Sequence, residues 1–371
     1  MPDVLFVSKP VAPPWDDGNK NLVRDVATSM QRYRPRVMVP RGSPLRGVES
    51  EGLYASAGEY RPSRWSNARV LARLIGGAQV DLWHFFFAPN RLTLRAGAIA
   101  RRVRGTPCVH TIASAPDDLE HVARMLFADR IIALSARTAA RLSRLGVRAV
   151  QVPPALRAPT VTRDEISASR ARHGLPATYV LYAGDLEGGD GAETFVRAAS
   201  VKSDRAWVIA SRPKTPRAAH AETALRARAS EQGTPIVWLG RIDDIHAVVA
   251  GAACVVLSSN TLQAKIDWPL VLLEALSLSV PVIVAKATPA EELAESGGAT
   301  VIASGDPRAL VDAVDRWAGL AVDERVGTLS VAAAWVRSRC NPAAVASAYE
   351  AVYDELIDSR ARDARSEGPT R

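Results

Sequence analysis

One segment in the second half of the chain holds the residue types best suited to chemistry. Residues 258–281, SSNTLQAKIDWPLVLLEALSLSVP, contain three charged candidates, which are Lys265, Asp267 and Glu274. Glu274 interrupts a leucine-rich run that predicts a helix from about Pro269, capped by one of the two residues before it. Because burying an unpaired carboxylate is costly, Glu274 needs water or a partner. A pair of ligand hydroxyls is the functional partner, and a neighbouring Arg is the structural alternative.

A glycine-rich loop precedes that segment. Residues 184–191, GDLEGGDG, place Gly184, Gly188 and Gly189 where the backbone can take a positive φ or approach a ligand closely. Asp185 contributes to the acidity of this loop, so backbone amides must outweigh its carboxylates before a phosphate can bind. A glycine-rich turn by itself is a weak signal.

Two cations follow the next apolar run. Residues 211–216, SRPKTP, supply Arg212 and Lys214. At the end of a strand such a pair can neutralise a diphosphate. The alternative is that both are solvated loop charges.

The first half offers a loop and two histidines. In residues 9–20, KPVAPPWDDGNK, the sequence Gly18, Asn19 and Lys20 stands just before a predicted helix, where free backbone N–H groups can meet an anion. The loop lacks the spacing of a P-loop or dinucleotide fingerprint, and a plain strand-to-helix connection is the alternative. His84 and His110 end or occupy apolar runs, as catalytic candidates or as hydrogen-bonded core histidines.

Short apolar runs separated by helix-length segments must position these residues. Each run is continuous rather than alternating, which is typical of strands buried on both faces of a parallel sheet. The expected strands are residues 4–7, 37–39, 82–87, 108–112, 131–134 and 149–152, then 179–183, 207–210, 236–239, 254–257, 282–285 and 300–302. Strand-helix alternation repeated in both halves predicts two doubly wound α/β domains.

The predicted domains share one organisation. We expect a basic first domain over residues 1–155, a linker over 156–176, a second domain over 177–340, a helix over 341–358 crossing back to the first domain, and a disordered tail over 359–371. Among helices, residues 21–32 carry an apolar stripe, and Ser135 is the expected cap of Ala136–Leu145. Ligands of open α/β sheets bind beyond the carboxyl ends of the strands, so the cleft between the domains is the expected site.

The segment that contains Glu274 resembles the signature of a known enzyme family. The stretch PLVLLEALSLSVPVIVA resembles the signature of family 4 glycosyltransferases, E-x-F-G-L-V-L-L-E-A-x-A-x-G-x-P-V. Weaker similarity runs from about residue 3 to 357, including FADRIIALSARTAARLSRL and VWLGRIDDIHAVVAGAACVVL. The resemblance implies the GT-B fold, two Rossmann-like domains facing each other across a cleft, and transfer of a sugar from a nucleotide sugar with retention.

The resemblance also implies roles for individual residues. Glu274 matches the glutamate that holds the nucleotide ribose, whereas the first glutamate of the signature falls on Ile266. The family's loop cations correspond to Asp185 and Asp190, and its T-x-H histidine corresponds to Ala113. Arg212, Lys214 or Lys265 would then have to neutralise the diphosphate. A subgroup pattern K-x-D-x-P-L-V-L-L-E makes Lys265, Asp267 and Glu274 one coherent set.

Charge is divided unequally along the chain. Residues 1–160 hold 24 Lys and Arg against 12 Asp and Glu, a balance of +12, while residues 161–371 hold 23 against 27, a balance of −4. This asymmetry favours an anionic partner for the first half. Residues 91–104, RLTLRAGAIARRVR, predict a basic helix that lies on an anionic membrane or, alternatively, a half-buried helix whose arginines face water. Aromatic residues make up only 6%, which argues against nucleic-acid binding.

Composition restricts the remaining possibilities. Three separated cysteines predict neither a zinc site nor disulfides, and with no signal peptide or membrane span they favour the cytoplasm. No D-x-D motif is present, so we expect no metal and no cofactor beyond the nucleotide-sugar co-substrate. The leading interpretation is a metal-independent glycosyltransferase acting on an unknown acceptor. The alternatives are a catalytically degenerate GT-B protein that serves as a partner subunit, and a GT-B-like enzyme with other chemistry on a nucleotide sugar.

Overall fold

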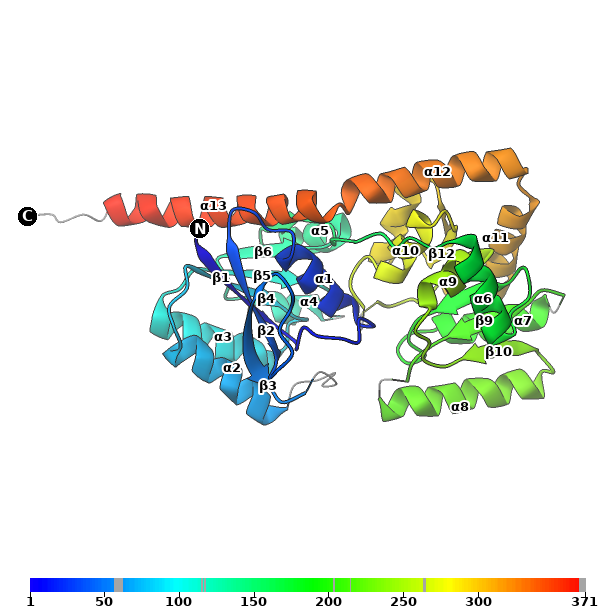
Figure 1. The fold of residues 1–371 in the computed structure, drawn as a ribbon, viewed down its shortest axis with the longest axis horizontal. Helices are drawn as coiled ribbons and strands as arrows, with labels where there is room; N and C mark the ends of the chain where they lie inside the picture. Colours follow the sequence, from blue (N-terminus) through cyan, green and yellow to red (C-terminus); the bar gives the residue numbers. More distant parts are fainter. Residues whose placement is uncertain are drawn as a thin grey trace, which may run out of the picture. The chain divides into compact units, whose positions relative to one another are not determined.

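The computed structural model describes residues 1–56, 63–114, 116, 118–202, 204–213, 215–262 and 265–366. The chain folds into two compact α/β units (Figure 1). The first unit contains Met1–Arg157, Lys265–Asp267 and Cys340–Arg371, and the second contains Ala158–Ala264 and Trp268–Arg339.

A parallel sheet forms the centre of the first unit. In the described residues it has seven strands in the order β3-β2-β1-β4-β5-β6-β7. The strands are β1 Asp3–Ser8, β2 Arg34–Pro40, β3 Glu49–Tyr54, β4 Leu82–Phe86, β5 Cys108–Ile112, β6 Arg130–Ala133 and β7 Ala149–Gln151. The helices of this unit are α1 Gly18–Ala27, α2 Arg64–Gly76, α3 Arg91–Arg104, α4 Leu119–Ala123, α5 Ala136–Arg144 and α13 Pro342–Ser366.

The second unit repeats this architecture. Its parallel sheet has the order β10-β9-β8-β11-β12-β13. The strands are β8 Val180–Ala183, β9 Trp207–Ala210, β10 Ile236–Leu239, β11 Cys254–Leu257, β12 Val282–Ala285 and β13 Ala299–Ile302. The helices are α6 Arg163–His173, α7 Gly191–Val201, α8 Pro216–Glu231, α9 Ile245–Ala250, α10 Leu270–Ser277, the 3₁₀-helix η1 Pro289–Ser296, α11 Pro307–Gly319 and α12 Val322–Arg339.

The continuous apolar runs are the strands of the two sheets. All twelve predicted strands are confirmed, with bounds that differ by no more than a few residues, and every residue of β4, β5, β8 and β11 is buried. Strand β3, ESEGLY, was not predicted from the sequence. It is an edge strand without an apolar run, and Tyr54 is its one buried residue. The prediction of a doubly wound α/β fold is therefore confirmed for each unit.

Helix α1 begins earlier than its apolar stripe indicated. The predicted helix was residues 21–32, whereas α1 spans Gly18–Ala27. The Asp17 side chain accepts hydrogen bonds from the backbone N–H groups of Asn19 and Lys20, which fixes the N-terminus there. The predicted cap at Ser135 is confirmed, since its hydroxyl accepts a bond from the N–H of Thr138.

Helix α13 belongs to the first unit, where it packs against α1. The buried carboxylate of Glu350 accepts hydrogen bonds from the backbone N–H groups of Gln31 and Arg32, each at 2.7 Å. The helix continues to Ser366, past residue 359, where a disordered tail was expected to begin. Arg360 explains part of the difference, because its guanidinium donates to the carbonyl of Gly105 at 2.6 Å.

The predicted linker contains a helix of the second unit. Helix α6 packs against α9, and Arg170 of α6 donates to the carbonyl of Gly251 at 3.0 Å. The boundary between the units lies at Arg157 and Ala158. Among the described residues, no helix is both long enough and apolar enough to cross a membrane.

Candidate functional site

The strand order of each sheet selects one edge for ligands. In both sheets the order reverses between two neighbouring strands, β1 and β4 in the first unit and β8 and β11 in the second. Crevices form at the carboxyl ends of such neighbouring strands because their connections leave in opposite directions. In the second unit these ends open into the loop of residues 184–191 and the segment that begins at Ser258.

The glycine-rich loop packs tightly against the segment after β11. Gly189 has a φ of +79°, and a Cβ atom added there would lie 2.1 Å from the Ser259 hydroxyl oxygen. Gly188 has a similar φ of +80° but faces open space. The sequence prediction of positive φ or close approach thus describes the loop, although the close approach seen here is to Ser259.

Asp190, at the end of this loop, is held by hydrogen bonds. Its carboxylate accepts from the backbone N–H of Asn260 at 2.9 Å and from the hydroxyl of Ser304 at 2.8 Å. Asp190 also stands at the N-terminus of α7. Its negative charge is therefore directed to neighbouring loops, and its position keeps the two carboxyl-edge segments together.

Two buried hydroxyl groups lie at the carboxyl end of β11. The Oγ atoms of Ser258 and Ser259 have no hydrogen-bond partner within the described part of the chain, and both residues are buried. Leaving a buried polar atom unpaired costs free energy. These hydroxyls are therefore suited to an additional polar group at this edge of the sheet.

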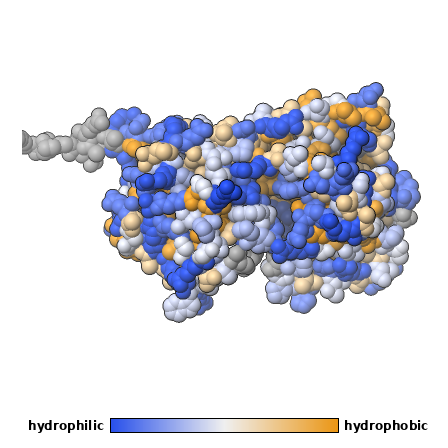
Figure 2. Space-filling view, in the orientation of Figure 1, coloured by the Kyte–Doolittle hydropathy of each residue, from blue (hydrophilic) through white to orange (hydrophobic). Residues whose placement is uncertain are grey.

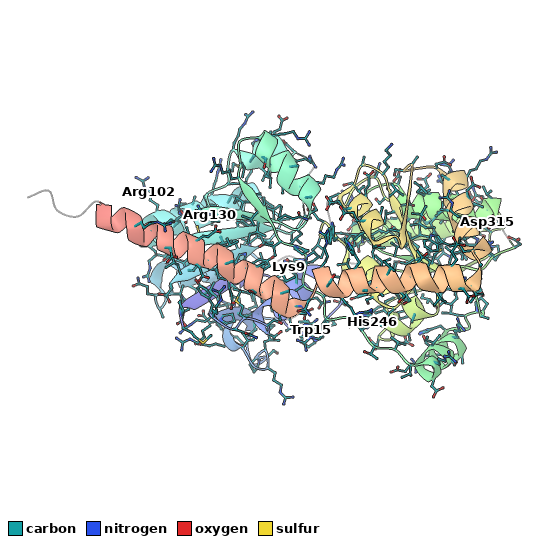
Figure 3. The ribbon with its side chains drawn as sticks, turned by 90° about the horizontal axis from the view of Figure 1, so that it is seen from above. Lys9, Trp15, Arg102, Arg130, His246 and Asp315 are labelled. Atoms are coloured by element: carbon teal, nitrogen blue, oxygen red, sulfur yellow. The ribbon has the colours of Figure 1, made fainter. Side chains whose placement is uncertain are left out.

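Glu274 lies on α10, half-buried among leucines. Its Oε1 is 3.5 Å from Nε2 of His246 on α9, and the Glu274 side chain is 14% exposed against 45% for His246 (His246 is labelled in Figure 3). The partner is thus a histidine, where the sequence alternative was an arginine. The carboxylate retains some access to solvent, and therefore to a ligand.

The start of α10 differs from its predicted form. The helix begins at Leu270 with Pro269 in the capping position and no side-chain cap, so Asp267 does not cap it. The buried Trp268 instead anchors this end: its ring packs against Trp335 and its N–H donates to Glu292 at 3.1 Å. This packing fixes the direction in which α10 leaves the sheet.

The three cations that the sequence offered for a diphosphate lie in different parts of the chain. Arg212 is half-buried just after β9, and Lys265 is half-buried ahead of α10, but within the first unit. Lys214 lies outside the described residues. Gly184 and Asp185 follow β8 directly, and the carbonyl of Asp185 accepts a bond from the Tyr182 hydroxyl at 2.9 Å.

In the first unit the loop after β1 is ordered by its own polar groups. Lys9 Nζ lies 2.9 Å from the carboxylate of Asp17, and the Asn19 amide donates to the carbonyl of Phe86 at 3.0 Å (Lys9 is labelled in Figure 3). Lys20 is buried, and Gly18 is the first residue of α1. The Oδ1 atom of Asn19 is buried without a hydrogen-bond partner among the described residues. That atom is the acceptor in this loop that is suited to a ligand.

The two catalytic candidates His84 and His110 are core residues. Both are 0% exposed. The nitrogens of His84 lie 2.5 Å from the Tyr353 hydroxyl and 2.7 Å from the Thr111 hydroxyl. Burial lowers the pKa of His84 well below its usual value and that of His110 to about 4. This placement favours the alternative that both are core histidines, because both rings are enclosed within the first unit.

Asp267, the third catalytic candidate, is also buried. Its carboxylate accepts a hydrogen bond from the Ser135 hydroxyl at 2.7 Å, and its N–H donates to the carbonyl of Ala113 at 2.9 Å. The neighbouring Ile266 is buried too, and a Cβ atom added at Gly18 would lie 3.8 Å from its side chain. Residues 265–267 are thus attached to the first unit, and the catalytic expectation for Asp267 is replaced by this anchoring role.

Four residues at this edge of the second unit were not predicted as site residues: His246, Ser258, Ser259 and Ser304. His246 stands nearly thirty residues before Glu274, so only the packing of α9 against α10 brings them together. The serines carry no motif of their own. Their position directly after a predicted buried strand is the one signal that could have identified Ser258 and Ser259.

Comparison with known proteins identifies a family match in the second unit. Residues 177–319 match the family model described as "Glycosyl transferases group 1". This match covers less than half of the chain but includes both carboxyl-edge loops of the second unit and α10. No curated protein matches the sequence.

Solved structures share the fold over nearly the whole chain. HepE of Anabaena, crystallised with UDP and glucose, has 17% identity and a TM-score of 0.79, covering 96% of this chain and 100% of its own. Sucrose-phosphate synthase of Thermosynechococcus elongatus has 18% identity and a TM-score of 0.77, covering 97% and 100%. A glycosyltransferase of Rickettsia africae has 14% identity and a TM-score of 0.73, covering 96% and 98%. The chain therefore has the two-unit α/β fold of GT-B glycosyltransferases, and its second unit carries the group 1 glycosyltransferase match.

Proposed function

We propose that this protein is a glycosyltransferase that moves a sugar from a nucleoside-diphosphate sugar to an acceptor. The nucleotide sugar binds at the carboxyl edge of the second sheet, between the loop of residues 184–191 and α10. The match of residues 177–319 to group 1 glycosyltransferases supports this reaction class. The solved structure of HepE with UDP and glucose makes a UDP-sugar the first donor to test.

The observation that carries the proposal is the position of Glu274. Its carboxylate is half-buried on a helix of leucines and has solvent access beside His246. A carboxylate held in this way can accept two hydrogen bonds from the vicinal hydroxyls of a ribose, and charge-assisted bonds of this kind are strong. His246 then fixes the orientation of the carboxylate from the opposite side.

The leaving diphosphate requires positive potential. The N-terminus of α7 follows the glycine-rich loop, and its backbone N–H groups supply part of that potential. Arg212 and Lys214 are the proposed cationic partners on the second unit, and the hydroxyls of Ser258 and Ser259 add donors. Such groups stabilise the developing phosphate charge without a metal ion. Metal independence and retention of configuration are parts of this proposal.

The acceptor is assigned to the basic first unit. Near the carboxyl edge of its sheet, a groove of about 590 Å³ is lined by Arg137, Arg141 and Arg144 of α5, together with the acids Asp118 and Glu120 at α4. The three arginines lie at spacings of four and three residues, so they share one face of the helix. An acceptor that carries both a phosphate and hydroxyl groups suits this mixture of charges.

A second candidate function is that of a GT-B protein that binds a ligand or partner without transferring a sugar. The hydrogen bonds of Asp190 favour it, because they place a carboxylate where the resemblance implies a cation. The burial of Ile266 favours it as well, since the residue at the first signature glutamate serves packing. A third candidate, different chemistry on a nucleotide sugar, predicts donor consumption without glycoside formation.

Calorimetric titration with UDP, GDP, ADP and CDP tests the proposal. We expect micromolar binding of one nucleotide by the wild-type protein and a loss of ten- to a hundred-fold in affinity for Glu274→Ala, because two charge-assisted hydrogen bonds disappear. Glu231→Ala, at an exposed position at the end of α8, is the matched control and should bind like wild type.

The outcomes separate the three functions. Binding followed by donor-dependent sugar transfer supports the glycosyltransferase. Binding without turnover for any acceptor tested supports the partner subunit. If no nucleotide binds to the wild-type protein, the proposed donor site is wrong.

A further inference from the structure

Helix α3 exposes large apolar side chains, unlike an ordinary amphipathic helix, which buries them. The face toward the rest of the unit carries Leu94 with the small residues Gly97 and Ala100, all buried. A Cβ atom added at Gly97 would lie 2.2 Å from the ring of Phe127, so this face is close-packed. This face accommodates one large apolar side chain, Leu94, and the other large apolar side chains of α3 lie elsewhere on the helix.

Those apolar side chains point into solvent. Leu92, Ile99 and Val103 are 65%, 55% and 60% exposed. Their spacing of seven and four residues places them in one line along the helix. Exposing three large apolar side chains in a line is unfavourable in water, and such patches mark interaction surfaces.

A line of arginines runs beside this apolar line. Arg95 and Arg102 are both exposed, and each follows an apolar residue of the first line by three positions. No Asp or Glu occurs between Arg91 and Arg104. We call the surface formed by Leu92, Arg95, Ile99, Arg102 and Val103 the α3 outer face. Figure 1 shows α3 beside α2 in the first unit, and Figure 2 shows that hydrophilic and hydrophobic residues alternate over the visible face of the molecule.

The remaining arginines hold the helix in this orientation. Arg101 forms an ion pair with Asp129, and Arg104 donates to the carbonyls of Ile75 and Gly77 at 3.2 and 3.3 Å. Because these contacts come from the opposite flank of α3, rotating the helix to bury the α3 outer face would break them. The exposed apolar line is therefore a fixed property of the folded unit.

The neighbouring helix adds an aromatic residue. Helix α2 packs beside α3, and Trp65 in its first turn is 79% exposed. Tryptophan is favoured at the boundary between lipid headgroups and acyl chains because its ring is apolar and its N–H is polar. Trp65 is thus a further exposed side chain of the first unit that suits a membrane boundary.

We propose that the α3 outer face binds the surface of a membrane that contains anionic lipids. Leu92, Ile99 and Val103 enter the boundary between headgroups and acyl chains, while Arg95 and Arg102 contact lipid phosphates. The balance of +12 over residues 1–160 adds a long-range attraction to the same surface. An acidic protein would match the arginines, but it would leave the apolar line unexplained unless it presented an apolar groove.

Vesicle flotation tests this surface directly. The full-length protein is mixed with vesicles of phosphatidylcholine alone or with 30% phosphatidylglycerol. We expect the wild-type protein to float with the anionic vesicles only. The triple variant Leu92→Ser, Ile99→Ser, Val103→Ser and the double variant Arg95→Glu, Arg102→Glu should each reduce partitioning at least ten-fold.

Matched controls exclude general effects of hydrophobicity and charge. Val322, Val326 and Val331 of α12 are 66%, 61% and 65% exposed, so their replacement by Ser removes a similar apolar surface elsewhere. Arg217→Glu with Arg337→Glu makes the same charge change at exposed positions of the second unit. Both controls should partition like wild type.

Three results would overturn the proposal: no flotation of the wild-type protein with anionic vesicles, equal flotation of the α3 variants, or equal loss in the controls. Circular dichroism and the unfolding midpoint of each variant identify any that fail to fold. Nucleotide titration is measured separately, so this surface can fail while the donor site stands, and the reverse.

Discussion

Three buried polar residues of the first unit differ from three polar residues of the second unit in whether the fold supplies their hydrogen-bond partners. In the first unit His84, Asp267 and Glu350 are buried and their polar atoms are hydrogen-bonded to other parts of the same unit. In the second unit Glu274 keeps solvent access, and the hydroxyls of Ser258 and Ser259 have no partner among the described residues. His84, Asp267 and Glu350 therefore contribute to the stability of the first unit, whereas Glu274 and the two serine hydroxyls of the second unit are available to a ligand.

This difference follows from what each unit has to hold in place. The first unit must retain α13, which is separated from its sheet by the whole second unit in sequence. Directional hydrogen bonds from α13 to loops and strands fix its position. The second unit is nearly contiguous, so its polar groups need not perform that task.

The largest expected effect comes from Glu350→Ala. This change leaves the N–H groups of Gln31 and Arg32 without their acceptor and removes one of the two carboxylates that pair with the Arg32 guanidinium, the other being Asp354. We expect a loss of about 2–4 kcal/mol in the free energy of unfolding, measured by denaturant titration. Glu355→Ala, at an exposed position on the same helix, is the control and should change it by less than about 0.5 kcal/mol. Equal effects of the two changes would show that Glu350 does not anchor α13.

The second effect is a loss of stability in mild acid. The pKa of His110 is lowered to about 4 in the folded protein because of burial, while in the unfolded chain it is about 6.5. Below pH 6.5 the unfolded state therefore binds a proton that the folded state excludes, so stability falls as the pH falls. Linkage gives a loss of about 3 kcal/mol by pH 4, and His84 adds to it in the same direction.

Unfolding curves between pH 7 and pH 4 measure this slope. In His110→Gln the amide keeps a donor for the carbonyl of Phe87 but does not titrate. The slope should become shallower in this variant. A wild-type protein whose stability is constant over this range would mean that the two histidines are not buried in neutral form.

The smallest effect separates two glycines of the loop of residues 184–191. Gly189→Ala combines a positive φ with a collision at Ser259, and should cost about 2–3 kcal/mol and weaken nucleotide binding. Gly188→Ala has the same φ but open space around it, so only the backbone term of about 1 kcal/mol remains. Thermal unfolding and titration of the two variants make the comparison. Identical losses would show that contact with Ser259 does not shape this loop.

Much of the fold was predictable from local patterns. Continuous apolar runs identified twelve strands, because a strand in a parallel sheet is buried on both faces. The cap at Ser135 was identified because a serine before a helical stretch satisfies free N–H groups at its start. The edge strand β3 was not predicted, since an edge strand needs few apolar residues.

The site was predictable only in part. Glu274 was identified as a candidate because a carboxylate among leucines needs water or a partner. The glycines of residues 184–191 predicted an unusual backbone conformation, and two of them have positive φ. The histidines were ambiguous, since the same residue type serves catalysis and core hydrogen bonding. The partners of His84 are Tyr353 and Thr111, and the partner of His110 is the carbonyl of Phe87. All three lie more than twenty residues away in sequence from the histidine that they contact, so nothing local distinguished the two roles.

The sequence by itself determined the fold class, the strands and the unusual carboxylate, because periodicity and single misplaced charges are local properties. Tertiary structure alone decided which polar residues are hydrogen-bonded within the fold and which remain available to a ligand. That decision depends on contacts between distant segments: Tyr353 with His84, Asn260 and Ser304 with Asp190, His246 with Glu274. The same holds for α3, whose apolar residues face outward because Gly97 must lie against Phe127.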